Sequence, residues 1–280
     1  MKRWLPPDFA KRCLIHLLMA ALGLLAIIPL YIVFINVTRS TVEINTGLSF
    51  LPSTHFPDNW RILNTNSLGL GRGFFNSFLI ASLSCGLAAY FSAMTAYGLH
   101  LYRFRGRGFV WGVILIAMTL PASISFIGFY QSMERLKLLN TYIPLVVPAI
   151  ASPVSVFFIR QYLVTLPVRE LAEVSRIDGA GEFRVFNAIA LPIMVPAIAT
   201  QAFFAFVASW NNFFTPFILL SNLKLYTLPM MVQLLQTNIH NVDFGSLYLG
   251  IAVSIFPIVC CYAISARYLI AGLTAGSLKE

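Results

Sequence analysis

The chain has 280 residues, of which 58% are hydrophobic and only 10% are charged. Soluble globular domains carry about 25% charged residues, so this composition excludes an ordinary soluble domain and indicates a membrane protein. The net charge of +9 would suggest nucleic-acid binding in a soluble protein. In a membrane protein it raises instead the question of which loops hold the positive charge.

Six stretches without Lys, Arg, Asp or Glu divide the chain into expected membrane spans. Each exceeds the ~20 residues that a helix needs to cross the hydrocarbon core, and continuous apolar runs favour helices over barrel strands. An alternative to six spans adds a re-entrant seventh segment around residues 213–220. We predict an all-α, polytopic membrane protein with six transmembrane helices, at about residues 13–36, 74–99, 109–133, 138–159, 185–209 and 244–266.

Positive charge predicts the orientation of these spans. Residues 1–12 hold four basic residues, and the apolar run that follows is far longer than the 7–15 residues of a cleavable signal, so we expect a retained anchor. With residues 1–12 as a cytoplasmic N-terminus, the inner segments hold 13 of the 19 lysines and arginines. The positive-inside rule then places both termini in the cytoplasm, with residues 13–280 as a single transmembrane domain of the cell membrane.

The chain offers no residues for chemistry of its own. Its four cysteines form no C-x-x-C pair, its four histidines have no metal-ligand spacing, and no G-x-x-x-x-G-K-[ST] sequence occurs. We therefore expect no catalytic residue, no metal and no bound cofactor. A stand-alone channel or secondary carrier is the alternative function, but the spans lack the intramembrane charged groups that such proteins use. A membrane enzyme would need clustered acids, histidines or nucleophiles, which the spans also lack.

A polar segment, residues 166–184, separates the fourth and fifth spans and is expected in the cytoplasm. Pro167 suits a first helical turn, Glu170 and Glu173 lie where the helix dipole favours carboxylates, and Asp178-Gly179 supplies a helix stop. Arg169 and Arg176 are spaced to pair with Glu173. We predict a short helix, a glycine turn and a second helix from about residue 182.

The pattern of this helix favours docking to a protein. A helix that rests on lipid headgroups prefers a bulky apolar face and a basic polar face. Here the polar face carries acids as well as arginines, and the apolar stripe is narrow, formed by Val168, Leu171, Ala172 and Ser175.

A known motif covers the same segment. The spacing Glu173-x-x-x-x-x-Gly179, followed by Ile189-x-Leu191-Pro192, resembles the EAA motif of ABC importer membrane subunits, and R-I-D-G-A-G at 176–181 is similar to the form in carbohydrate-uptake permeases of the maltose type. The chain resembles the subunit of that family with six core spans and a short C-terminal tail. Further matches occur in order: F-F-N-S-F-L-I-A (74–81), Y-R-F-R-G-R (102–107), L-L-N-T-Y (138–142), S-W-N-N-F-F (209–214), T-L-P (227–229) and G-L-T-A-G-S-L-K (272–279).

The resemblance implies a permease subunit of an ATP-driven, binding-protein-dependent importer for a carbohydrate or a related polyol or glycerol-phosphate solute. It implies alternating access, driven by a separate ABC ATPase dimer that binds ATP and magnesium. A homologous permease subunit would complete a heterodimer, and an extracytoplasmic solute-binding protein would deliver the solute. The segment 166–184 would be the coupling helix, with ATPase-coupling residues Glu170, Glu173, Arg176, Asp178, Gly179 and Ala180.

The residues of the solute pathway are less defined. An aromatic ring can stack on a sugar and amides can bind its hydroxyls, which suggests Trp210, Asn211, Asn212 and Phe214, although a tryptophan can also anchor the membrane interface. Prolines in the fourth and fifth spans either open the backbone toward a cavity or only kink the helices. The chain departs from the family at Val174 and Ser175, where the motif has two alanines, and at Asn212, where a glutamate is usual.

Overall fold

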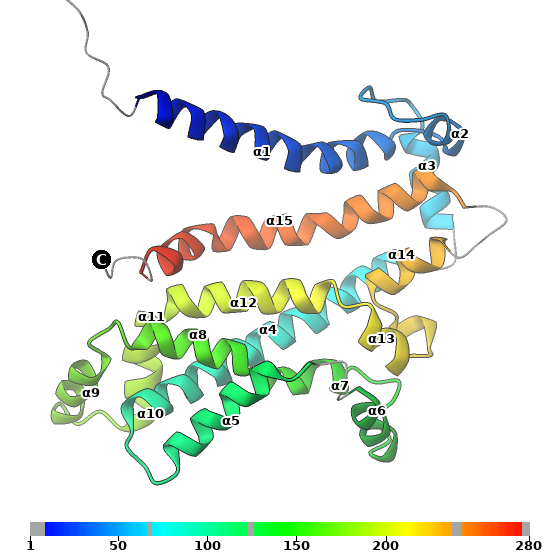
Figure 1. The fold of residues 1–280 in the computed structure, drawn as a ribbon. Helices are drawn as coiled ribbons and strands as arrows, with labels where there is room; N and C mark the ends of the chain where they lie inside the picture. Colours follow the sequence, from blue (N-terminus) through cyan, green and yellow to red (C-terminus); the bar gives the residue numbers. More distant parts are fainter. Residues whose placement is uncertain (1–8, 66–68, 122–125, 237–241, 276–280) are drawn as a thin grey trace, which may run out of the picture. The chain divides into compact units, whose positions relative to one another are not determined.

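The computed structural model describes residues 9–65, 69–121, 126–236 and 242–275, and every regular element in these ranges is a helix, as predicted (Figure 1). The expected N-terminal segment 1–12 and the C-terminal match 272–279 lie largely outside the described residues. The chain forms two compact units. Unit 1 holds Met1–Leu70 and Val232–Ile255, and unit 2 holds Gly71–Met231 and Phe256–Glu280.

Within the described ranges, four helices are long and apolar enough to cross a membrane: Lys11–Asn36, Leu70–Leu101, Ile143–Leu163 and Phe244–Leu269. A strongly bent pair of helices would make a fifth span. The predicted span 109–133 is divided between α5 (Arg107–Thr119) and α6 (Phe126–Arg135). The 13 residues of α5 rise only about 20 Å, less than the thickness of the hydrocarbon core. The count of six spans therefore stays a prediction.

Unit 1 contains α1 (Phe9–Asn36), α2 (Thr41–Asn45), α3 (Phe56–Thr65), the second half of α14 (Leu228–Gln236) and the start of α15 (Phe244–Ala275). The side chains of α1 are exposed along most of its length. Beyond its end, Asn59 of α3 donates to the carbonyls of Val37 (2.8 Å) and Arg39 (2.9 Å). The core of the unit is small and contains Val37, Leu63, Leu235, Leu247 and Leu249.

Unit 2 is a helical bundle organised around α4 (Leu70–Leu101). Small buried residues of α4, among them Ser92, Ala93 and Ala96, allow neighbouring helices to approach closely. The main core joins this half of α4 to α8 (Pro153–Leu163), α9 (Val168–Ile177) and η2 (Val185–Ala190). The other elements are α7 (Ile143–Val146), η1 (Val147–Ile150), α10 (Glu182–Arg184), α11 (Leu191–Ile193), α12 (Val195–Trp210), α13 (Phe214–Leu219) and η3 (Leu223–Leu225). Within this unit, α9 lies at one end and α13 toward the other (Figure 1).

Prolines divide the fourth and fifth predicted spans into shorter pieces. Pro144, Pro148 and Pro153 each occupy the first or second position of a new helical segment, where a missing N–H is tolerated. The fifth span begins as a π-helical turn, η2, and then bends by 79° between Glu182–Ile193 and Val195–Trp210. Pro196, at the start of α12, likewise begins a new helix after this bend. The segment that carries α9 is thus followed by a sharp bend in the chain, between α11 and α12.

Candidate functional site

The helix α9 ends in a left-handed turn at Gly179, as the sequence predicts. Gly179 has φ +82°, and its N–H donates to the carbonyl of Arg176 (3.0 Å). The N–H of Ala180 donates to the carbonyl of Ser175 (3.0 Å), which completes a Schellman stop. A Cβ atom at Gly179 would meet no atom within 4 Å. The backbone conformation, and not a shortage of space, therefore requires glycine here.

The apolar residues of α9 lie on two faces, which corrects the single stripe expected from the sequence. Val168 and Ala172 are each 1% exposed and belong to the core of unit 2. The opposite face carries an exposed apolar row that the sequence interpretation missed. The recurrence of large apolar residues at every third position, from 171 to 177, is the signal that could have revealed it. The outer row consists of Leu171 (40% exposed), Val174 (58%), Ile177 (86%) and, at the start of α10, Phe183 (77%).

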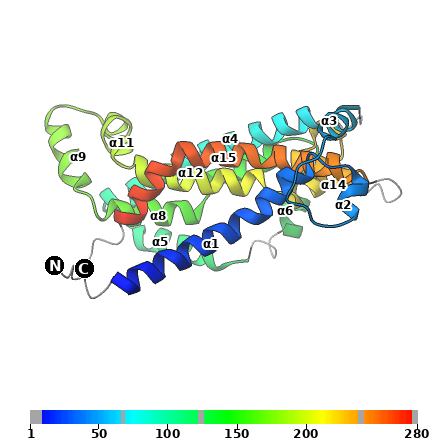
Figure 2. The ribbon, with the colours of Figure 1, turned by 90° about the horizontal axis from the view of Figure 1, so that it is seen from above.

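The acidic residues predicted to contact a partner lie in the same segment as the outer row. Glu170, Glu173 and Asp178 are all exposed. Both views show α9 at one end of its unit, beside the corner formed by α11 (Figure 1 and Figure 2). A partner protein could therefore meet apolar and acidic side chains on one short helix.

Three residues tie α9 to its surroundings, and we name them the clasp: Tyr102, Arg176 and Glu182. Arg176 donates from Nε to Glu182 Oε1 (2.7 Å) and from Nη2 to Oε2 (3.1 Å). The hydroxyl of Tyr102 donates to the same carboxylate, and the guanidinium carbon lies 5.8 Å from the centre of the Tyr102 ring. The two-pronged geometry of an arginine–carboxylate pair fixes orientation as well as distance. The clasp therefore sets the position of the turn between α9 and α10.

The predicted pairs of Glu173 with Arg169 and Arg176 are not among the ion pairs of the described residues. Arg176 binds Glu182 instead. Arg169 donates from Nη2 to the carbonyls of His100 and Leu101, both at 3.4 Å. Both arginines thus hold α9 to neighbouring elements, and Glu173 stays available at the surface.

The contacts within the clasp shift the pKa values of its three members. Hydrogen bonds from Arg176 and Tyr102 lower the pKa of the Glu182 carboxyl, whereas the bonds to Glu182 raise the pKa of the Arg176 guanidinium. Burial, followed by the hydrogen bond to Glu182, raises the pKa of Tyr102. A polar cavity of about 280 Å³ opens beside these groups, lined by Leu101, Tyr102, Arg103, Arg169, Glu173, Arg176 and Glu182.

Two other sequence motifs have structural roles in unit 2, toward the end away from α9. Asn76 donates to the carbonyls of Lys224 (3.0 Å) and Tyr226 (2.9 Å). The side-chain oxygen of Asn140, a residue with φ +58°, accepts the N–H groups of Ser221 (2.7 Å) and Asn222 (3.1 Å). These asparagines of F-F-N-S and L-L-N-T-Y therefore fix the irregular backbone of residues 221–226.

The candidate solute residues lie around the start of α13. Trp210 is 1% exposed, stacks on Phe206 (5.9 Å) and meets Phe74 edge-on (5.4 Å). The side-chain oxygen of Asn212 accepts a hydrogen bond from the N–H of Thr215 (3.2 Å). An asparagine commonly makes this contact at the start of a helix, here α13. The other two candidates, Asn211 and Phe214, are exposed, and Phe214 contacts Phe126. A solute role for this group stays a prediction.

Comparisons with known proteins agree with this architecture. Residues 87–274 match the family described as the binding-protein-dependent transport system inner membrane component. The arabinooligosaccharides transport system permease protein AraQ of Halalkalibacterium halodurans is 36% identical over 93% of this chain and 94% of its own length. The sn-glycerol-3-phosphate transport system permease protein UgpE of Escherichia coli is 28% identical over 91% of this chain and 93% of its own.

A solved structure shares the fold. It is a bacterial ABC transporter involved in the import of the acidic polysaccharide alginate, and the match has a TM-score of 0.81 at 21% identity, covering 96% of this chain and 100% of that one. Together with the apolar helices, these matches identify a multi-pass membrane protein. The chain belongs to the family of inner membrane components of binding-protein-dependent transport systems.

Proposed function

We propose that this chain is the permease subunit of an ATP-driven importer for a carbohydrate or a related polyol or glycerol-phosphate solute. The solute class rests on relatives whose names state arabinooligosaccharides and sn-glycerol-3-phosphate. The observation that carries the coupling mechanism is the exposed outer row of α9, presented by a helix whose other face is packed in the core of unit 2.

Coupling follows from how α9 is held. Closure of an ATPase dimer, which would bind ATP and magnesium, pulls on the outer row and the adjacent acids. The inner residues Val168 and Ala172 share one core with α4, α8 and η2, and packed cores transmit displacement instead of absorbing it. The bundle then moves as a body between inward- and outward-facing states. A homologous permease subunit forms the other half of the solute pathway, and an extracytoplasmic binding protein delivers the solute.

A docking experiment tests this mechanism directly. The permease pair and the ATPase are co-expressed and purified through a tag on the ATPase. Ile177→Asp places a charge on the most exposed member of the outer row and should reduce both co-purification and ATP-dependent uptake by at least tenfold. Ile177→Leu keeps an apolar side chain and serves as the matched control. Equal co-purification of the two variants would contradict docking through α9, and uptake without ATP would favour a stand-alone carrier.

Orientation and solute need separate measurements. Reporter fusions after Arg105 and Arg176 should both report the cytoplasm, because an ATPase that docks on α9 is a cytoplasmic partner. A signal from the other side at either position would refute the topology. The ligand specificity of the cognate binding protein would define the solute, since the permease chain alone offers only the candidate residues near α13.

A further inference from the structure

The segment Gly-Leu-Ser-Phe-Leu-Pro, residues 47–52, links α2 to α3 in unit 1 and contains no charged residue. Its three large apolar residues, Leu48, Phe50 and Leu51, are 77%, 59% and 76% exposed. We name these three residues the loop tip. Contiguous apolar side chains at a surface mark a site that contacts a partner or a membrane.

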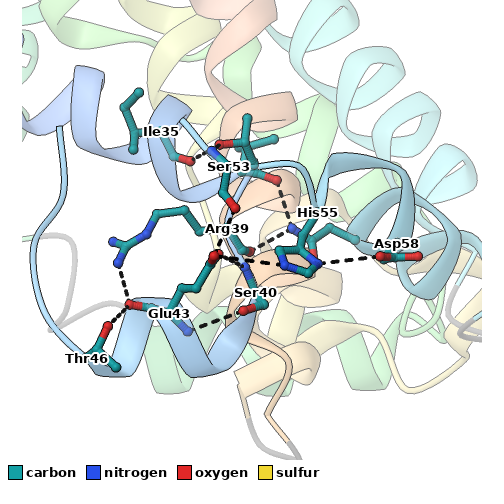
Figure 3. A network of polar contacts seen from close by, with 11 residues as sticks. Ile35, Arg39, Ser40, Glu43, Thr46, Ser53, His55 and Asp58 are labelled. Carbon is teal, nitrogen blue, oxygen red and sulfur yellow. Dashed lines mark hydrogen bonds and ion pairs between the residues drawn. The ribbon is translucent and has the colours of Figure 1, made fainter. Parts of the chain in front are cut away.

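A polar network holds both ends of the loop (Figure 3). At one end, Arg39, itself only 6% exposed, donates to the carbonyls of Gly47 (3.0 Å) and Glu43. At the other end, the N–H of Ser53 donates to the hydroxyl of Thr38 (2.8 Å), and the Ser53 hydroxyl donates to the Glu43 carboxylate (2.9 Å). The loop therefore has a defined base that fixes the position of the tip.

Tyr31 sets the depth of the tip along α1. Its hydroxyl donates to the carbonyl of Phe50 (2.7 Å), and the two rings stack with centres 6.4 Å apart. Tyr31 lies five residues before the end of α1 at Asn36, which is about 7.5 Å along the axis at 1.5 Å per residue. The most apolar 18-residue window within Lys11–Asn36 has a mean hydropathy of 2.7, the highest among the four candidate spans in the described ranges. The loop thus folds back beside the last turns of a membrane helix.

The surroundings at this depth favour lipid as the partner. The final turns of α1 expose Leu30 (45%), Tyr31 (44%) and Phe34 (54%), and Tyr31 contacts Phe50 of the tip. Tyrosine suits the zone where acyl chains meet headgroups, and an uncharged tip enters that zone without the cost of burying a charge. We propose that the loop tip inserts into the lipid interface and anchors this end of α1 in the bilayer. The proposal goes beyond transport and depends on neither the solute nor the ATPase.

Photo-crosslinking in the complete importer tests the anchor. The photoreactive residue p-benzoylphenylalanine replaces Leu51, whose exposure leaves room for it, and the complex is reconstituted into vesicles of phosphatidylethanolamine and phosphatidylglycerol. Irradiation should attach lipid acyl chains to the peptide that contains position 51, detected by its mass. The control places the same residue at Asp58, whose side chain is 69% exposed and whose neighbour Asn59 binds backbone beyond the end of α1.

The expected result is at least a fivefold excess of lipid adduct at position 51 over position 58. A crosslink from position 51 to another protein subunit would overturn the proposal, because it would identify a protein as the occupant. Equal lipid adducts at both positions, or none at position 51, would also overturn it. Because the readout is a mass and not a transport rate, failure of the anchor remains distinguishable from failure of the proposed function.

Discussion

Replacing Gly179 with alanine should weaken coupling through backbone strain alone. Gly179 has φ +82°, and an added Cβ would meet no atom within 4 Å. An L-residue in the left-handed conformation loses about 1–2 kcal/mol, so the variant destabilises the turn without disturbing any contact. Gly181 has equally open space but φ −69°, which any residue adopts. Gly181→Ala is therefore a matched control from the same turn.

The size of the effect follows from this strain. A loss of 1–2 kcal/mol changes an equilibrium constant by a factor of about 5–30. If α9 docks only when the turn is formed, the affinity of the permease for the ATPase should fall by this factor. Asparagine tolerates the left-handed region better, so Gly179→Asn should lose less. Gly179→Pro should lose all uptake, because proline requires φ near −65° and removes the N–H that donates to Arg176.

The assay is a titration of the solubilised permease pair with the ATPase dimer, repeated as ATP-dependent uptake in proteoliposomes. The expected order of affinity is Gly181→Ala equal to wild type, then Gly179→Asn, Gly179→Ala and Gly179→Pro. Membrane insertion, measured by the yield of folded permease, should be equal throughout. The reasoning would be refuted if alanine were tolerated equally at 179 and 181, or if asparagine were more damaging than alanine.

Three further predictions concern how α9 and the opposite end of unit 2 are held. Glu182→Gln should weaken the exposed pair with Arg176 by about 0.2–1 kcal/mol. Because the pKa of Glu182 is lowered from 4.5, its stabilisation is present above that value and is lost as the pH falls below it. The protection factors of amides in the turn, which are corrected for the intrinsic exchange rate at each pH, should therefore fall with acid in wild type and not in the variant. Ala172→Leu should overpack the core by about 1–3 kcal/mol and lower both thermal stability and uptake, whereas the exposed Ile177→Leu should not. Asn76→Ala should leave two loop carbonyls without their donor and lower the free energy of unfolding by about 1–3 kcal/mol, measured by thermal denaturation.

The sequence predicted the helical fold because hydropathy and charge spacing are local properties. The expected spans 13–36, 74–99 and 244–266 fall within α1, α4 and α15. The bend at residue 194 was not predicted, since a hydropathy window averages over residues and holds no direction. The prolines indicated a break near this point, but not its angle of 79°. The extent of the apolar helical segments could be predicted from the sequence, and the direction in which the chain continues after residue 194 could not.

The turn of α9 was predictable for the same reason, since an Asp-Gly stop acts through its own backbone. The clasp was not, because Tyr102 and Glu182 are 80 residues apart in sequence. Local spacing favoured Glu173 as the partner of Arg176, yet an exposed pair of this kind stabilises a helix by only about 0.2–0.5 kcal/mol. Glu182 presents both carboxylate oxygens to the guanidinium and also accepts from Tyr102, so the distant pair prevails over the local one.

The two faces of α9, one buried in the core and one exposed, also explain the two departures from the family motif, Val174 and Ser175. Val174 belongs to the exposed outer row, and Ser175 donates its hydroxyl to the carbonyl of Leu171 within the helix (2.6 Å). Neither side chain enters the core, which α9 joins through Val168 and Ala172. The added volume at Val174 therefore leaves the packing of α9 on unit 2 unchanged and alters only the exposed outer row. We therefore expect any effect of this departure at the contact with the proposed ATPase partner and not in the packing of α9 within this chain.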